Sequence, residues 1–151
     1  MKIFRTFEEI IDYAIDSEMN EIEFYSDLAE RMDRKNVKQL FMNIALEKTA
    51  RMLRLEKMKD LRIEFDVDEV QDMKIAGALE DIDCTKTDLS YQEALILAMK
   101  KEKDKFKFYS EMSEVAVNKE CRDTFLALAN EEARQKLKFE IEYDEFILVE
   151  N

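Results

Sequence analysis

Hydrophobic residues recur every three or four positions in four separate stretches of the chain. The clearest stretch is residues 40–58, where Phe41, Ile44, Leu55 and Met58 fall on one face of a helix. A helix with one such face buries it against a core. The pattern therefore predicts four amphipathic helices, each with one face turned inward.

Capping boxes mark where the first and third helices begin. Thr6 with Glu9, and Ser90 with Glu93, place a hydroxyl and a carboxylate three residues apart, which can satisfy free backbone N–H groups. The remaining boundaries come from polar corners. We predict hairpins over residues 6–61 and 89–151, joined by a long crossover over residues 62–88 in which residues 68–80 can form a short helix.

The two hairpins repeat each other without a gap. Residues of matching type stand 84 positions apart, and they include the capping residues, a Phe-Tyr pair and a core Phe: Thr6 and Ser90, Phe24-Tyr25 and Phe108-Tyr109, Phe41 and Phe125. This register indicates an internal duplication. We predict an all-α, antiparallel four-helix bundle built from two duplicated helical hairpins, with residues 1–151 forming one domain.

Polar side chains interrupt the apolar faces at matching heights. The interrupting residues are Glu18 in the first helix, Lys48 and Arg51 in the second, Glu102 in the third, and Glu132 and Gln135 in the fourth. Glu21 also falls on the inward face, and in the third helix either Lys105 or Phe106 does. A buried cation without a partner costs several kcal/mol. We therefore expect the functional site of this protein, or what remains of such a site, among the residues that face Lys48 and Arg51.

These positions resemble the rubrerythrin branch of the ferritin-like di-iron family. Residues 18–29 and 102–113 look like the family's ligand Glu followed six residues later by Phe-Tyr. Residues 41–51 and 125–135 are similar to the pattern F-x-x-L-A-x-E-E-x-x-H, in which the second Glu and the His bind iron. The resemblance implies a homodimer and metal ligands at Glu18, Glu102 and Glu132, with Gln135 as a further candidate, and carboxylate hydrogen bonds from Tyr25 and Tyr109.

Three of the six ligand positions have changed. Lys48 stands where the family has Glu, Arg51 and Gln135 stand where it has His, and the chain contains no His. Four carboxylates balance two Fe²⁺ ions, whereas three carboxylates beside Lys48 and Arg51 come to about −1 without metal. We therefore expect these two cations to replace the iron in a buried ionic layer, with no cofactor and no catalytic residue.

Alternatives remain open at each of these residues. The three glutamates could be partly exposed, and Lys48 and Arg51 could extend outward to solvent. Tyr25 and Tyr109 could be ordinary core aromatics. The second hypothesis for function is an oxidoreductase of the peroxide reductase type that holds iron or another divalent ion. It would need a separate electron donor, because the chain has no CxxC motif for a rubredoxin-type iron site.

Composition limits the partners. The net charge is -12, with 36 acidic and 24 basic residues, which argues against nucleic acid. The longest apolar run, Ala94 to Met99, is too short for a membrane span. We expect a cytoplasmic protein without a membrane partner. The basic surface of the second helix and the apolar run Phe146 to Val149 form a third possibility, a docking face for another protein.

Overall fold

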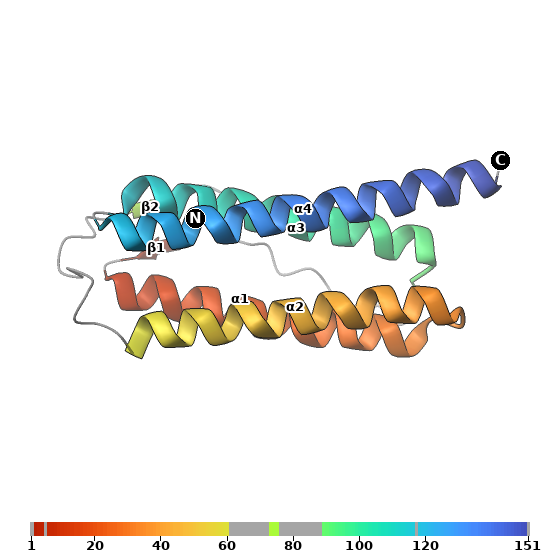
Figure 1. The fold of residues 1–151 in the computed structure, drawn as a ribbon, viewed down its shortest axis with the longest axis horizontal. Coiled ribbons are helices and arrows are strands. Elements are labelled where there is room, and N and C mark those ends of the chain that lie inside the picture. The colour runs from red at the N-terminus through yellow and green to blue at the C-terminus, as the bar shows by residue number, and fades with distance from the viewer. Residues whose placement is uncertain (1, 5, 61–72, 76–88, 117, 151) are drawn as a thin grey trace. The chain divides into compact units, whose positions relative to one another are not determined.

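The computed structural model describes residues 2–4, 6–60, 73–75, 89–116 and 118–150. Two compact units divide the chain, one over Lys2–Lys74 and one over Ile75–Asn151. Four long helices and two short strands are placed, in the order β1 (Lys2–Phe4), α1 (Phe7–Arg31), α2 (Lys35–Asp60), β2 (Met73–Ile75), α3 (Tyr91–Val115) and α4 (Lys119–Glu150) (Figure 1).

The helices pair as two hairpins, α1 with α2 and α3 with α4. The predicted all-α class is confirmed, and the expected hairpins are both present (Figure 1). Most of the predicted crossover lies outside the described residues. The expectation of a short helix within residues 68–80 is wrong for the three residues that the structure describes there. Met73–Ile75 is a strand that pairs with β1. That the whole chain forms a single domain stays a prediction.

Both predicted helix starts are confirmed by their hydrogen bonds. The Thr6 hydroxyl accepts a bond from the Glu9 backbone N–H at 3.1 Å, and the Ser90 hydroxyl accepts one from the Glu93 N–H at 3.1 Å. Each bond satisfies one of the amide donors that the first helical turn leaves open. The two caps make α1 and α3 begin 84 positions apart, and both helices have 25 residues.

The hairpins also repeat each other in their cores. Tyr25 stacks on Phe41 with ring centroids 6.2 Å apart, and Tyr109 stacks on Phe125 at the same 6.2 Å. In each hairpin the preceding Phe meets its Tyr edge-on, at 5.1 Å in α1 and 5.4 Å in α3. All of these rings are buried. The 84-residue register found in the sequence therefore describes the packing as well as the residue types.

The end of α4 packs on the start of α3. Phe146 meets the Tyr91 ring edge-on at 5.3 Å, and the Tyr91 hydroxyl donates a 3.0 Å hydrogen bond to Glu142. Leu148, two residues further along α4, is exposed. Part of the apolar C-terminal run thus covers its own hairpin. Among the residues that the structure describes, no helix is long and apolar enough to cross a membrane.

Candidate functional site

Four polar side chains are buried in the first hairpin: Glu18 and Glu21 on α1, and Lys48 and Arg51 on α2. Their spacing of three residues on each helix keeps both members of a pair on the inward face. Lys48 has no exposed surface and Arg51 is only 2% exposed, so neither extends to solvent. The alternative in which these two cations point outward is wrong.

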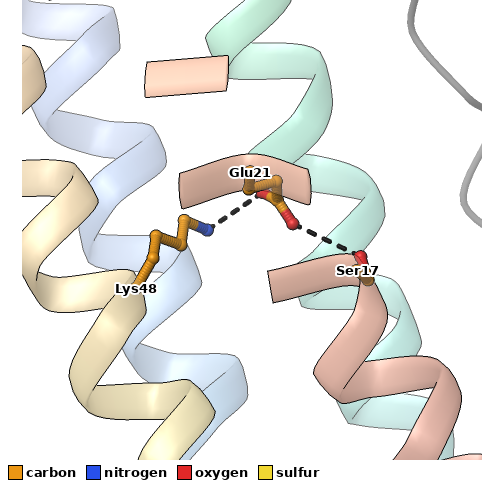
Figure 2. Close-up of polar contacts among 3 residues, drawn as sticks. All are labelled: Ser17, Glu21 and Lys48. Carbon is orange, nitrogen blue, oxygen red and sulfur yellow. Dashed lines mark hydrogen bonds and ion pairs between the residues drawn. The ribbon is translucent and has the colours of Figure 1, made fainter. Parts of the chain in front are cut away.

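Lys48 forms an ion pair with Glu21 inside this hairpin. Its Nζ atom lies 3.1 Å from Glu21 Oε1, and both side chains are almost fully buried (Figure 2). The hydroxyl of Ser17 donates a 3.4 Å hydrogen bond to the other oxygen, Oε2. The carboxylate is therefore contacted from its own helix and from the facing one. An ammonium group buried this deeply needs such a partner, because burial without one is strongly unfavourable.

The aromatic core contacts the same ammonium group. Lys48 Nζ lies 6.0 Å from the centre of the Tyr25 ring. This is at the outer limit of a cation–π contact, which adds to the stabilisation of a desolvated cation. Tyr25 is fully buried and stacked on Phe41, so its position is set by packing. This packing agrees with the alternative in which Tyr25 and Tyr109 are core aromatics, and the hydrogen bonds to carboxylates that the resemblance implies stay a prediction.

Besides Ser113, the described part of the second hairpin has four buried polar residues: Glu102 and Lys105 on α3, and Glu132 and Gln135 on α4. Glu102 and Glu132 have no exposed surface, which rules out partly exposed positions for them. Lys105 Nζ lies 5.4 Å from the centre of the Tyr109 ring. Each hairpin thus contains one fully buried lysine against its stacked tyrosine.

The sequence alone leaves the contacts of two residues undetermined. Glu21, to which the resemblance assigns no role, is a carboxylate beside Lys48. In the third helix Lys105 is the buried residue, whereas Phe106 is 37% exposed. A signal for both was present, because Lys105 follows Glu21 by the same 84 positions that relate the rest of the repeat. Extending the comparison from Glu18 to Glu21, one helical turn further, would have identified both Glu21 and Lys105.

The buried Cys121 does not provide a nucleophile. Burial raises the pKa of its thiol to about 12, so the thiolate that reacts is absent at neutral pH. Val37 stands 84 positions earlier and is also buried. Cys121 therefore acts as a small apolar residue of the core.

The side chains present do not fit a di-iron centre. In the described part of the chain, no group of three or more His, Cys, Asp or Glu residues could hold a metal ion. Position 48, where the resemblance implies a ligand carboxylate, instead has an ammonium group 3.1 Å from Glu21. A protonated amine has no free electron pair for a metal. Its charge also opposes a divalent ion nearby.

Comparisons with known proteins relate this chain to a protein family and to solved structures of the same fold. The family model for rubrerythrin matches residues 9–143. A Thermotoga maritima protein proposed to be a ferritin-like diiron-carboxylate protein has a similar structure, with a TM-score of 0.79 and 22% identity over 96% of this chain and 99% of that one. A hypothetical protein from Pyrococcus furiosus gives a TM-score of 0.73 and 25% identity, over 91% of this chain and 87% of that one. No curated protein matches the sequence. The fold is thus a ferritin-like four-helix bundle.

Proposed function

Because the chain belongs to the rubrerythrin family, we propose that it is a ferritin-like bundle in which buried ionic groups replace the di-iron site, with a structural or partner-binding role instead of catalysis. One observation carries the proposal. The Lys48 ammonium group is fully buried and lies 3.1 Å from the Glu21 carboxylate. A fixed positive charge at this position supplies the counter-charge that a metal ion would otherwise give to the glutamates.

Charge balance supports the proposal. At an effective dielectric of about 20, two unit charges about 4 Å apart repel by about 4 kcal/mol, and a divalent ion doubles that figure. Lys48 would therefore weaken the binding of any divalent ion beside it. Arg51 adds to this effect because it is buried and does not lose its proton. With Gln135 in place of His, the chain also lacks both of the nitrogen ligands that the family pattern provides.

Anaerobic titration with Fe(II) tests the proposal. Purified protein should retain far less than two irons per chain after gel filtration. The control is the same titration of a ferritin-like protein that keeps all six ligands, run side by side. Two tightly held irons per chain that react with hydrogen peroxide would contradict the proposal, because they would require the lysine to leave its carboxylate.

The second candidate is an enzyme that uses one hard divalent ion. Glu102, Glu132 and Gln135 are buried in one hairpin, and their oxygens suit Mg²⁺ or Mn²⁺ better than iron. The fully buried Lys105 of the same hairpin counts against this function. If it is correct, Glu132→Ala abolishes Mn(II) binding and a separate protein must supply electrons. Equal Mn(II) content in the wild type and in Glu132→Ala excludes it.

The partner-binding role has its own support on the outer face of α2. Met42, Leu46 and Leu53 lie on one exposed stripe of this helix, spaced four and seven residues apart, and Leu46 is 64% exposed. This spacing is that of a helix seam which packs against another helix. The other face of α2 is already occupied by the core of its hairpin. We propose a second copy of this chain as the partner.

The spacing of the apolar residues along the stripe supports that choice. In a twofold, antiparallel pairing of two α2 helices centred between residues 47 and 48, Met42 faces Leu53 of the other copy. The same register places Lys35 opposite Asp60, which have opposite charges, and Lys38 opposite Lys57, which have like charges. Sedimentation tests this: Leu46→Glu should convert dimers into monomers, and Leu148→Glu, at an exposed site on α4, should not. A wild-type monomer at high concentration excludes this pairing.

A further inference from the structure

Lys105 is a fully buried lysine on α3, and its burial requires a carboxylate partner. Its Nζ atom lies 5.4 Å from the centre of the Tyr109 ring, but an aromatic ring alone compensates only part of the cost of desolvating a full charge. The second hairpin offers two buried carboxylates for this purpose. They are Glu102, on the same helix as Lys105, and Glu132, on the facing helix.

The repeat register identifies which carboxylate is the partner. Lys105 and Glu132 each follow a member of the Glu21–Lys48 pair by 84 positions, Lys105 following Glu21 and Glu132 following Lys48. Both bounds of α1 and α3, the starts of α2 and α4, and the stacked Tyr and Phe rings all repeat in this register. Two positions that face each other in the first hairpin therefore face each other in the second.

We infer that Lys105 forms a buried ion pair with Glu132, with the charges exchanged between the helices. In the first hairpin the acid is on the first helix and the lysine on the second. In the second hairpin the lysine is on the first helix and the acid on the second. Each hairpin thus provides its own fixed cation. The part of this inference that concerns metal rests on the proposed function: Lys105 blocks a divalent ion at Glu132 independently of Lys48 and Arg51.

A double-mutant cycle tests the ion pair. Lys105→Met and Glu132→Gln are made singly and together, and stability is measured by urea unfolding. The two changes should be strongly coupled. The unfolding equilibrium constant of the double variant should be at least tenfold smaller than the value obtained by multiplying the two single effects. Lys105→Glu combined with Glu132→Lys should recover stability relative to either single change. Additive effects, or coupling of Lys105 with Glu102 in a parallel cycle, would overturn the inference.

A measurement on the unaltered protein covers the case in which the single variants do not fold. A crystal structure should place Lys105 Nζ within about 4 Å of a Glu132 carboxylate oxygen, the usual limit for an ion pair. A structure in which Lys105 contacts only Glu102 would overturn the pairing.

The effect on metal binding is tested in a chain with restored ligands. The starting variant carries Lys48→Glu, Arg51→His and Gln135→His, and Mn(II) bound per chain is measured by equilibrium dialysis. Adding Lys105→Gln should raise the bound Mn(II) by one ion per chain, whereas adding Lys103→Gln, at an exposed lysine two residues earlier, should not. Equal binding with and without Lys105→Gln would overturn the blocking role. If the proposed function is wrong, the wild-type protein itself binds metal. That result is distinct from equal binding by the two ligand-restored variants.

Discussion

Lys48 and Glu21 form a salt bridge of 3.1 Å in which the lysine has no exposed surface and the carboxylate is almost completely buried. The two residues come from facing helices of one hairpin, α2 and α1 (Figure 2). A buried pair of this kind is a poor source of net stability, because both ions lose their hydration. Removing either residue nevertheless leaves the other as a buried charge that has lost this partner.

Breaking this pair should destabilise the protein strongly. Lys48→Met leaves the Glu21 carboxylate buried without its ammonium partner, and the free energy of unfolding should fall by about 3–5 kcal/mol. Urea unfolding at pH 7 measures the change. The double variant Lys48→Met/Glu21→Gln should lose much less than the sum of the two single changes, since no buried charge is left unbalanced.

The surface pair Asp12–Lys59 is a matched control, because it joins the same two helices at 2.6 Å but is 36% and 47% exposed at its lysine and aspartate. Asp12→Asn should cost about 0–1 kcal/mol, and this cost should shrink as salt is added. A similar cost for the buried and surface pairs would show that burial does not set the strength of the Lys48 contact.

Removing either helix cap should have nearly the same effect. Thr6→Ala and Ser90→Ala each delete a hydroxyl that accepts a backbone N–H at 3.1 Å, and each should cost about 1 kcal/mol. Thermal unfolding in parallel samples measures both. Ser110→Ala, within α3, is the control and should be neutral or slightly stabilising, because Ala has the higher helix propensity. A large cost at only one cap would show that the two helix starts are not equivalent.

Truncating the stacked aromatic residues should be costly in both hairpins. Phe41→Ala and Phe125→Ala each remove a buried ring that stacks on a tyrosine 6.2 Å away, and each should reduce the free energy of unfolding by about 3–5 kcal/mol. Phe106→Ala is the control, since this ring is 37% exposed. Its cost should be clearly smaller in the same urea unfolding assay.

Alkaline pH should destabilise the protein through Cys121. Burial raises the pKa of this thiol from 9.0 to about 12. Between these values the unfolded chain has lost the thiol proton while the folded chain keeps it, so the free energy of unfolding falls as pH rises, by at most about 1.4 kcal/mol per pH unit. Below the pKa that the thiol has in the unfolded chain, the stabilising contribution of the buried, protonated thiol is fully present.

Cys121→Val isolates that effect from other groups that titrate at alkaline pH. Val37 occupies the equivalent position in the first hairpin, so valine should fit the site. Unfolding of the wild type and of Cys121→Val is compared at about pH 8 and about pH 10.5. The wild type should lose more stability than the variant over this interval, and parallel losses would contradict the raised pKa.

The sequence predicts the features of this protein that depend on local patterns. Thr6 and Ser90 are identified as caps because their partners lie only three residues away. Phe41 and Leu55 are predicted to be buried because helical spacing alone assigns them to one face. The repeat could be found because it needs no gap. These elements require no knowledge of which side chains meet across the hairpin.

Contacts between helices could not be predicted from the sequence. Glu18 and Glu21 lie one turn apart on the same face of α1, and the spacing alone does not show that Glu21 contacts Lys48. Lys105 and Phe106 both fit the inward face of α3, and the usual preference for burying an aromatic residue favours the wrong one. The β2 strand was missed because its pairing partner, β1, lies about seventy residues earlier in the chain.

The mutual dependence of Glu21 and Lys48 limits which single substitutions this hairpin tolerates. A protein of this size has a total stability of about 5–15 kcal/mol, and loss of either partner removes about 3–5 kcal/mol of it. Glutamate at position 48 would place a second acid beside Glu21 and incur that penalty. Position 48 therefore accepts an acidic residue without a large loss of stability only when position 21 changes with it.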